Sequence, residues 1–511
     1  MLTQNLKKAL TKLFYILFGA TFSYLYIQSF IQEISMNYEL NKFLYFILGL
    51  GIMFLWFMIY KIINKYYEKL NSKQEYILLL STFIIFCIIF LFTILNLKMN
   101  PQWDYKVVFE QAKNYVLYGN RSADNQYQLY LQYHDNNIGL FILWIIIFKF
   151  FYIFKLTNFQ TIATIFNAIC IGLSILLIYL IIKKLLDKKK AYFSLIISLF
   201  FIPLFTYIPI FYTDTISMPF IILILYIYIN TNKEKTLCKK NILSLISIIL
   251  LSYFGGKIKM TVWIITIAIF IHFIFTQKIY KSLIIGFLLI FSTIGLNFLW
   301  EKTIIENKSL QIVENNYGAI PWQHYLMMGV QPKDTIIENI RCIGGYNHTD
   351  FERTLFFKTS KESKEYNIKE YVRRVKEYGA YGYFNYLTKK AVNAWAEGSY
   401  FTDYVYQFDY DYDNQFKLAI RGLNTKTLLY FEQGVSEAML YIFGAYGIIL
   451  LFRKKELNQT TIIPIAIYGI FIVLLFWENR SRYLVNYIPF FIMAITLFYA
   501  ELTSKKTKEK I

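Results

Sequence analysis

Residues 76–97, YILLLSTFIIFCIIFLFTILNL, form an uncharged run of 22 residues, and KMNPQWDYKVVF follows it at 98–109. A helix needs roughly 20 mainly apolar residues to cross the hydrocarbon core of a bilayer. The apolar residues are continuous and do not alternate with polar ones, which predicts a helix and not a strand of a barrel. The run is therefore expected to span a membrane and to leave Asp104 at the water edge just beyond it.

Similar apolar runs recur along the chain. Of its 511 residues, 57% are hydrophobic and 20% are aromatic, which excludes a water-soluble globule and predicts an all-α polytopic membrane protein. The opening segment lacks a small-residue cleavage site, so it is expected to be a retained span and not a signal peptide. Twelve spans are expected, at 11–33, 42–64, 75–97, 159–182, 191–209, 216–231, 241–254, 261–276, 282–300, 427–452, 460–477 and 483–501.

In a membrane protein, the distribution of the formal net charge of +20 first indicates which loops lie on the cytoplasmic side. With the N-terminus inside, the inner connections are all rich in lysine: KIINKYYEKLNSK, KKLLDKKK, NKEKTLCKK, QKIYK, RKKELNQ and the tail KKTKEK. This distribution follows the positive-inside rule, so the charge gives no reason to expect nucleic acid as a partner. Both termini are expected in the cytoplasm, and the bias towards Ile, Lys and Asn is typical of an AT-rich bacterial genome.

One apolar stretch, NNIGLFILWIIIFKFFYIF at 136–154, does not fit this count. A full span there would send KKLLDKKK to the outer side, so an interfacial or re-entrant helix with both ends outside is expected instead. The alternative is a thirteenth span. Asn136 and Asn137 are expected to cap this helix, because Asn is a strong N-cap residue, and to shape the loop around Asp104.

Two short outer loops carry basic residues against the positive-inside rule. Lys257 and Lys259 lie in GGKIKM, and Arg480 and Arg482 lie in WENRSRY. For any single one of them, snorkelling at the membrane interface is the alternative explanation. Two tight clusters favour a phosphate site, because Arg holds phosphate through a bidentate fork and Lys as a point charge. A phosphate at the outer membrane surface indicates a lipid-linked phosphate.

Two carboxylates complete the pattern on the outer side. Asp104 opens the first long loop, and Asp214 is expected in a tight outer turn within YIPIFYTDTISMPF. A carboxylate beside a phosphate pocket is the arrangement of a general base. The chain has no HExxH, Gly-x-Ser-x-Gly, P-loop or Rossmann pattern and its four histidines are dispersed, so no metal site and no cofactor are predicted, with a divalent ion left open.

In order along the chain, PQWDYKVVFEQA, YLQYHDNNIGLF, a basic inner loop and FYTD resemble the GT-C superfamily of integral membrane glycosyltransferases. The closest similarity is to its Gram-positive branch, in which a Tyr-Pro-Asn-Asn-x-Gly-Leu motif follows the first loop. The later segments IKMT, PWQHYLMMGV, GGYNHTD, NAWAEGSYF and FWENRSRYLVNYIP extend the resemblance over about 75–490. The chain departs from the branch in having Asp135 where the motif has proline, and in two spans that precede the family's first one.

The resemblance implies an organisation in four parts. Residues 1–74 would be two additional N-terminal helices, 75–300 a seven-helix catalytic module with the outer loop 98–158, 301–426 a long extracytoplasmic loop, and 427–511 the C-terminal spans and basic cytoplasmic tail.

The activity it implies is an inverting transfer of a sugar from a polyprenyl-phosphate donor to a cell-envelope acceptor, a polysaccharide or teichoic acid for example, outside the bacterial plasma membrane. Asp104 would be the general base and Asp214 a second acidic residue that orients the acceptor or the surroundings of Asp104. Lys259, with Arg480 or Arg482, would neutralise the leaving phosphate.

Further contributors and two other classes of function stay open. His324 and Asp350 are weaker candidates for contacts to sugar or phosphate. A flippase or other transporter of lipid-linked sugars would also hold phosphate, but matched broken helices in repeated halves are not seen. A ligase or polymerase of lipid-linked glycans would be indicated by an Arg pair in a large outer loop, such as Arg373 and Arg374.

Overall fold

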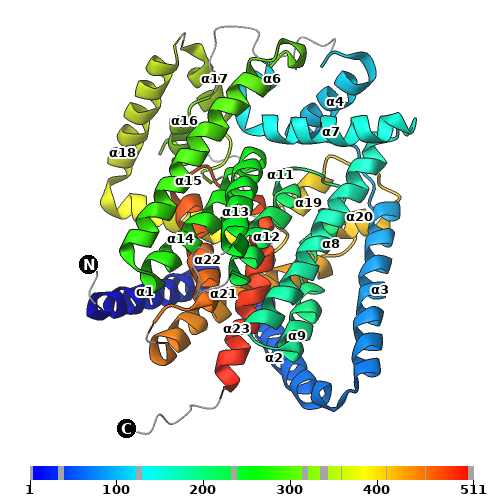
Figure 1. Cartoon of the computed structure of the whole chain (residues 1–511), viewed down its shortest axis with the longest axis vertical. Coiled ribbons are helices and arrows are strands. Elements are labelled where there is room, and N and C mark those ends of the chain that lie inside the picture. Colours follow the sequence, from blue (N-terminus) through cyan, green and yellow to red (C-terminus); the bar gives the residue numbers. More distant parts are fainter. Residues whose placement is uncertain are drawn as a thin grey trace.

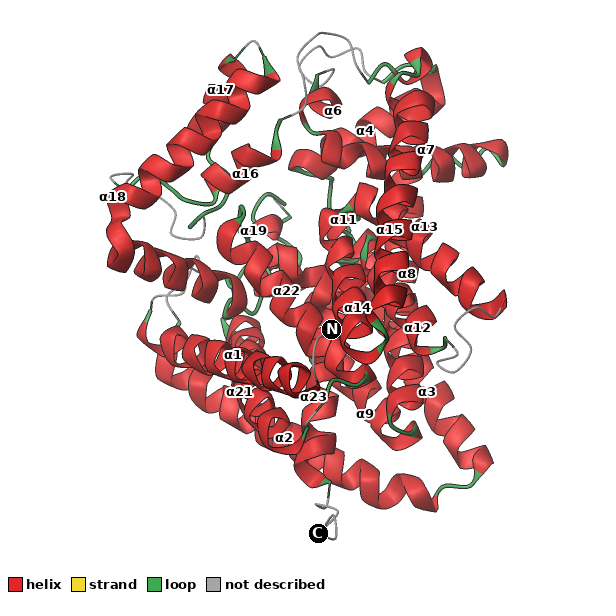
Figure 2. Ribbon diagram, turned by 60° about the vertical axis from the view of Figure 1, so that its left-hand side comes forward, coloured by secondary structure: helices red, strands yellow, loops and turns green. Residues whose placement is uncertain are grey.

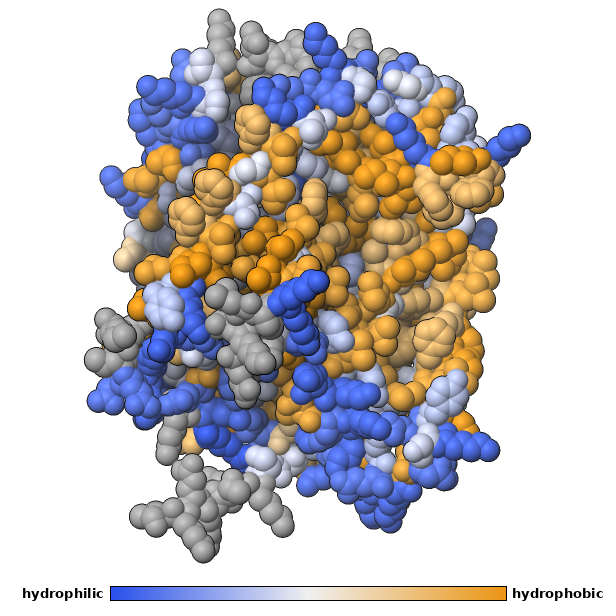
Figure 3. Space-filling model, in the orientation of Figure 1, coloured by the Kyte–Doolittle hydropathy of each residue, from blue (hydrophilic) through white to orange (hydrophobic). Residues whose placement is uncertain are grey.

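The fold is known from a computed structural model, and it consists of helices throughout the residues that it describes (Figures 1 and 2). Those residues are 4–32, 40–121, 129–231, 239–312, 320–333, 343–357, 359–409, 411–454 and 456–504. The predicted all-α class is confirmed. Figure 3 shows an apolar band between hydrophilic surfaces at the top and the bottom, as expected for a protein that crosses a bilayer. The predicted basic tail at 505–511 lies outside the described part.

Within the described ranges, ten helical segments are long and apolar enough to cross a membrane. Their helices are α1 (Gln4–Ile31), α2 (Lys42–Tyr66), α3 (Ser72–Asn96), α7 (Ile138–Ile153), α8 (Phe159–Leu185), α13 (Lys239–Ile258), α15 (Ile279–Trp300), α21 (Thr427–Arg453), α22 (Ile462–Phe476) and α23 (Ile488–Thr503). All except α7 coincide with predicted spans. The spans expected at 216–231 and 261–276 are the shorter helices α12 (Met218–Ile229) and α14 (Trp263–Thr276).

The prediction of one continuous span at 191–209 is wrong. The chain forms α9 (Lys188–Ser198), then the single turns α10 (Pro203–Thr206) and α11 (Thr213–Ile216). Pro203 cannot donate a backbone hydrogen bond, so the helix of α9 does not continue through it. Asn167 of α8 donates its side-chain amide to the carbonyls of Tyr207 and Ile208, at 2.8 and 2.9 Å. These bonds replace those that an uninterrupted helix would have provided.

Helix α7 lies across the ends of the spanning helices, as Figure 1 shows, although its length would let it cross a membrane. At its start, Gly139 packs so closely on the backbone of Lys257 that a Cβ would lie 2.1 Å from that carbonyl oxygen. Just after its end, Gln160 of α8 donates to the carbonyl of Met99, at 2.7 Å, immediately beyond α3. Both ends of α7 therefore lie at the same level, as expected for an interfacial helix.

The lysine-rich connections gather at the opposite end. Lys188 and Lys189 form ion pairs with Glu75 and Glu68, which joins the α8–α9 connection to the α2–α3 connection. Lys454 pairs with Glu501 at 2.7 Å, so the ends of α21 and α23 lie together.

Two further bonds tie the chain ends into this region. Thr503 donates to the hydroxyl of Tyr60 at 3.2 Å, near the end of α2, and Lys7 of α1 donates to the carbonyl of Phe275 at 2.8 Å. The first and last described helices therefore reach the same end of the molecule, here called the basic end.

The two N-terminal helices pack against the C-terminal part of the chain. α21 lies between α1 and α2, and α2 also contacts α9. Gly447 and Gly19 meet where α21 crosses α1, and a Cβ on Gly447 would lie 2.4 Å from the Cα of Gly19. Small residues at a crossing let two helix backbones approach closely inside a membrane. The helices of 1–74 thus extend the bundle formed by the last three spans.

A second layer of helices covers the end opposite to the basic end. It comprises α4 (Trp103–Tyr118), α6 (Tyr130–Tyr133), α16 (Trp322–Met328), α17 (His348–Phe356), α18 (Ser360–Trp395), α19 (Thr402–Tyr406) and α20 (Gln415–Ile420). α18 bends at Gly379, whose φ of 65° is in the left-handed region that glycine tolerates. Helices of the two long segments predicted at 98–158 and 301–426 therefore form one covering layer, of which α4, α6 and α17 are seen at the top of Figure 1.

Candidate functional site

Four of the predicted site residues lie together, although they come from four separate parts of the chain. Lys259 and Asp214 form an ion pair. The guanidinium Nη2 of Arg482 lies 3.9 Å from Oδ2 of Asp104. Arg482 is also within electrostatic range of Asp214 and Lys259. These residues, Asp104, Asp214, Lys259 and Arg482, are called the charged cluster below.

The two carboxylates of the cluster differ in exposure. The side chain of Asp214 is 2% exposed and belongs to the short helix α11 inside the broken passage, where the sequence predicted a tight outer turn. That of Asp104 is 43% exposed. Asp104 is thus the carboxylate that a substrate can reach, whereas Asp214 is occupied by Lys259.

Asp104 owes its position to the start of α4. The ring of Trp103 stacks on Tyr404 at 5.6 Å and meets Phe408 edge-on at 4.7 Å, so the first residue of the helix is anchored to α19 and the residues after it. Asp104 lies in the first helical turn, where the helix dipole stabilises negative charge. The carboxylate is therefore fixed in place at the N-terminal end of α4.

One buried amide holds the other parts of the cluster together. Asn486 lies in the short helix η8 (Ser481–Tyr487) with Arg482, and its side chain donates to Ser217 at 3.1 Å and to Thr261 at 2.8 Å. Ser217 follows the helix that carries Asp214, and Thr261 is two residues beyond Lys259. The amide therefore fixes the arginine segment relative to both members of the buried ion pair.

Tyrosine rings line the cations. The ammonium group of Lys259 lies 5.1 Å from the ring centre of Tyr483, and the guanidinium of Arg482 lies 5.3 Å from the same ring. Arg482 also lies 5.5 Å from the ring centre of Tyr212. Cations over aromatic faces keep their charge at modest cost when they leave water. These contacts help the cluster to hold two positive charges in a buried place.

The expectation that Asn137 caps α7 is wrong. No hydrogen bond runs from its side chain to the start of the helix. The amide instead donates to the hydroxyl of Tyr130 at 2.8 Å and accepts a hydrogen bond from the hydroxyl of Tyr212 at 3.0 Å. Burial, followed by the negative charge of Asp104, raises the pKa of Tyr130. Asn137 thus links the first outer segment to the walls of the charged cluster, whereas Asn136 is exposed.

The positive charges of the cluster are not equivalent. Lys259 is neutralised by Asp214, with which it forms the ion pair. The side chain of Arg482 is 16% exposed, and its buried Nε has no hydrogen-bond partner among the described residues. A buried donor without a partner carries a free-energy cost that an anionic ligand would remove. Within the charged cluster, Arg482 is therefore better prepared than Lys259 to receive a phosphate oxygen, and the Nε of the neighbouring Arg480 is likewise without a partner in the described part of the chain.

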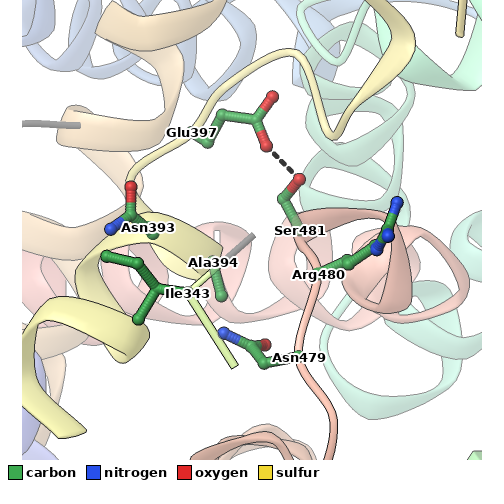
Figure 4. Close-up of a pocket in the computed structure, with 7 residues that line it drawn as sticks. All are labelled: Ile343, Asn393, Ala394, Glu397, Asn479, Arg480 and Ser481. Atoms are coloured by element: carbon green, nitrogen blue, oxygen red, sulfur yellow. Dashed lines mark hydrogen bonds between the residues drawn. The ribbon is translucent and has the colours of Figure 1, made fainter. Parts of the chain in front are cut away.

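Arg480 lines a small pocket next to the cluster, together with Asn393, Glu397, Asn479 and Ser481 (Figure 4). Its guanidinium lies 5.0 Å from the ring centre of Phe401. Glu397 accepts a hydrogen bond from the hydroxyl of Ser481, drawn as the dashed line in Figure 4. Arg480 and Arg482 therefore flank Ser481 and serve neighbouring parts of one polar region.

Lys257 lies apart from the cluster. Its ammonium group is 5.4 Å from the ring centre of Tyr253 and 5.2 Å from that of Trp300. The acidic residues that act on its charge are Asp135 and Glu301, and neither belongs to the charged cluster. The two lysines of GGKIKM thus have different surroundings, and only Lys259 joins the site.

His324 and Asp350 are engaged within the covering layer. Asp350 accepts two hydrogen bonds from Arg374, at 2.6 and 2.9 Å, and Arg374 is fully buried. His324 is bonded through Nδ1 to the hydroxyl of Thr354 at 2.7 Å, and burial lowers its pKa to about 4. Both side chains hold α16, α17 and α18 together.

Sequence reasoning missed Tyr130, Tyr212, Tyr483 and Glu478. Glu478 is 8% exposed and accepts a hydrogen bond from the hydroxyl of Tyr483 at 2.9 Å. Tyr212 and Tyr483 stand within two positions of Asp214 and Arg482, which was an available signal. In the described part of the chain, no three His, Cys, Asp or Glu side chains gather as metal ligands.

A family model described as a conserved hypothetical integral membrane protein matches residues 2–503, which include all members of the charged cluster. No curated protein matches the chain. No solved structure matches it. Because the family model covers nearly the whole sequence, the chain belongs to this family of conserved hypothetical integral membrane proteins.

Proposed function

We propose that the protein is an inverting glycosyltransferase of the GT-C type. It moves a sugar from a polyprenyl-phosphate donor to a cell-envelope acceptor, such as a polysaccharide or a teichoic acid, on the outer face of a bacterial plasma membrane. The observation that carries the proposal is the pairing of a reachable carboxylate, Asp104, with a largely buried cation, Arg482, whose Nε is unbonded in the described chain. A base beside a phosphate-binding group is what this transfer requires.

The reaction balances with these two groups. Asp104 takes the proton of an acceptor hydroxyl, and the oxygen attacks the anomeric carbon of the donor sugar. The bond between that carbon and the phosphate oxygen breaks, and the polyprenyl phosphate leaves with the electron pair. Arg482 neutralises the negative charge that develops on this phosphate. Asp214 acts through Lys259, which it holds against Tyr483 beside the arginine.

The structure weakens the support for a ligase or polymerase of preassembled glycans. Arg373 pairs with Glu370 and Glu377, and Arg374 with Glu370 and Asp350. Both arginines are therefore engaged in ion pairs within the covering layer. These ion pairs explain the arginine pair that favoured a ligase or polymerase.

A transporter of lipid-linked sugars is the second candidate, and the broken passage between α9 and α12 favours it. Backbone that leaves the helical form at membrane depth is typical of transporter binding sites. The two functions differ in their products, because transport moves the lipid and forms no glycosidic bond.

The test uses the purified full-length protein, a panel of polyprenyl phosphates that carry radiolabelled hexoses or pentoses, and envelope glycan from cells that lack the protein. Asp104→Asn should lower the transfer rate by about 10² to 10⁴ while the donor still binds, because only the proton acceptor is lost. Glu110→Gln is the matched control, since Glu110 lies on the same helix and pairs with Lys113 at 2.9 Å. Near-normal transfer by Asp104→Asn would exclude the base assignment.

A further inference from the structure

Three aromatic rings next to the charged cluster lie nearly parallel. The ring centres of Trp322 and Trp477 are 6.2 Å apart with planes inclined by 13°. Those of Tyr325 and Trp477 are 6.0 Å apart with planes inclined by 12°. Trp322 and Tyr325 belong to α16 in the covering layer, whereas Trp477 directly follows α22 of the bundle. This group of three rings is called the aromatic platform.

The backbone beneath the platform is held in place. Lys390 of α18 donates to the carbonyl of Trp477 at 2.5 Å and to that of Gly329 at 2.8 Å. Gly329 follows α16, and a Cβ there would lie 2.8 Å from the backbone of Trp477. Asn479 adds a bond from its backbone amide to the carbonyl of Gly344 at 2.7 Å. The elements that carry the rings are thus fixed relative to each other.

The platform borders the charged cluster. Trp477 is followed by Glu478, which is bonded to Tyr483, and this tyrosine lies beneath Lys259 and Arg482. Tyr325 lies within electrostatic range of Glu478, Asp135, Tyr483 and Asp104. The platform is therefore connected to the charged cluster through Glu478 and Tyr483.

Trp322 is 53% exposed, so much of its indole is open to a ligand. We propose that Trp322, Trp477 and Tyr325 form a stacking surface for a pyranose ring, either that of the lipid-linked donor or that of the acceptor. The apolar C–H face of a pyranose packs on an aromatic face, while its hydroxyls stay free for polar groups. The inference rests on the proposed function and adds the position of the sugar.

An interfacial tryptophan that only anchors the protein in the membrane is the contrasting explanation. An anchor needs no backing ring and no position beside a reactive carboxylate. In the platform, Trp477 stacks on Trp322, and the charged cluster is near. The platform thus combines an apolar stacking face with nearby cations, as the binding of a sugar phosphate requires. The polar pocket of Asn479, Arg480 and Ser481 begins two residues after Trp477, so donors and acceptors of hydrogen bonds are also at hand (Figure 4).

The experiment compares Trp322→Ala, Trp322→Phe and the control Tyr381→Ala in the transfer assay with purified protein. Tyr381 is 85% exposed on α18, so it matches Trp322 as an exposed aromatic residue of the same layer. Trp322→Ala should raise KM about tenfold for the substrate whose ring stacks, in line with the loss of one aromatic contact and its buried area. Trp322→Phe should retain most of the affinity, and Tyr381→Ala should behave like the wild type.

The two KM values distinguish the source of the ring. A rise for the polyprenyl-phosphate sugar assigns the platform to the donor, and a rise for the envelope glycan assigns it to the acceptor. Unchanged KM for both substrates in Trp322→Ala would overturn the inference. Equal losses in Trp322→Ala and Tyr381→Ala would overturn it too, because they indicate a general role of exposed aromatic residues in membrane anchoring.

A binding measurement separates this inference from the proposed function. If the wild type transfers no sugar, tryptophan fluorescence is titrated with each polyprenyl-phosphate sugar and with bare polyprenyl phosphate. Stronger quenching by a sugar-bearing lipid, lost in Trp322→Ala, would support the platform although transfer had failed. Identical quenching by lipids with and without sugar would overturn it.

Discussion

At the scale of single residues, the cations predicted to hold phosphate differ in what they contact. Arg482 lies beside Asp104 and has an unbonded Nε within the described structure. Arg482→Ala should therefore lower transfer by about tenfold to 100-fold, the equivalent of one charge-assisted hydrogen bond, while folding is retained. Initial rates and melting temperature measure the two effects. Lys257→Ala is the control and should transfer sugar normally, and an equal loss in both variants would contradict the assignment.

For Lys259 the expectation differs from that for Arg482, because its substitution should also lower stability. Removal of Lys259 leaves the carboxylate of Asp214, 2% exposed, without its ion-pair partner. Breaking a buried pair in this way costs about 3 to 5 kcal/mol. Lys259→Ala should unfold at a clearly lower temperature, and Lys259→Met combined with Asp214→Asn should recover stability but not transfer. Full stability of Lys259→Ala would show that the pair is not structural.

His324 predicts how stability depends on pH. Its pKa is lowered to about 4 by burial, from the usual 6.5, so the unfolded chain binds the proton more readily. The contribution of His324 to the free energy of unfolding is therefore fully present above about pH 6.5 and is lost as the pH falls towards 4. The loss amounts to about 3 kcal/mol and does not increase further below that pH. Melting temperatures at a series of pH values should show this fall, and His324→Gln should reduce it.

The matched control for this pH dependence is His348→Gln. His348 lies on the neighbouring helix α17 with its side chain 69% exposed. It should keep the wild-type dependence of melting temperature on pH. A dependence that is the same in His324→Gln as in the wild type would assign the acid sensitivity to other groups.

At the scale of elements, the broken passage between α9 and α12 depends on one amide of α8. Asn167 is fully buried and donates to the carbonyls of Tyr207 and Ile208. Asn167→Leu leaves the buried carbonyl of Ile208 without this bond, at about 1 to 3 kcal/mol, whereas the carbonyl of Tyr207 still accepts the backbone amide of Ile210 at 3.0 Å. The melting temperature should therefore fall, and transfer should fall with it. Ser174→Ala on the same helix is the control, because its hydroxyl donates to the carbonyl of Cys170 in its own helix. If Asn167→Leu melted at the same temperature as the wild type, the passage would be held by packing alone.

At the scale of the whole molecule, the arrangement of the two ends predicts the topology. Lys188 lies at the basic end in contact with Glu75, and His348 lies in the covering layer at the opposite end. In a background without native cysteines, His348→Cys should react with an impermeant reagent added to intact cells, because the covering layer is expected outside. Lys188→Cys should react only after permeabilisation. Labelling of position 188 from outside would invert the proposed orientation and place the charged cluster in the cytoplasm.

The sequence by itself determined that the protein lies in a lipid bilayer, that its fold is all-helical and where most of its spans lie. Hydrophobic runs of 20 or so residues leave the chain no alternative to membrane helices, and this holds whatever the helices later contact. The same local logic indicated the interfacial position of α7, because lysine-rich connections fix which segments cross. It also selected Asp104, Asp214, Lys259 and Arg482 one by one, since charges at a membrane edge are costly unless they serve a purpose.

Only the tertiary structure decided which of these charges meet and in what state. In the sequence, Asp214 resembles Asp104 and Lys257 resembles Lys259, because all four are charged residues of predicted outer loops. In the structure, Asp214 is buried against Lys259, whereas Lys257 lies beside Tyr253 and Trp300. The break after α9 also depends on a distant residue, the amide of Asn167. Ion pairs, helix breaks and ring stacks join positions that are far apart in the chain, so their energies depend on packing that no local pattern contains.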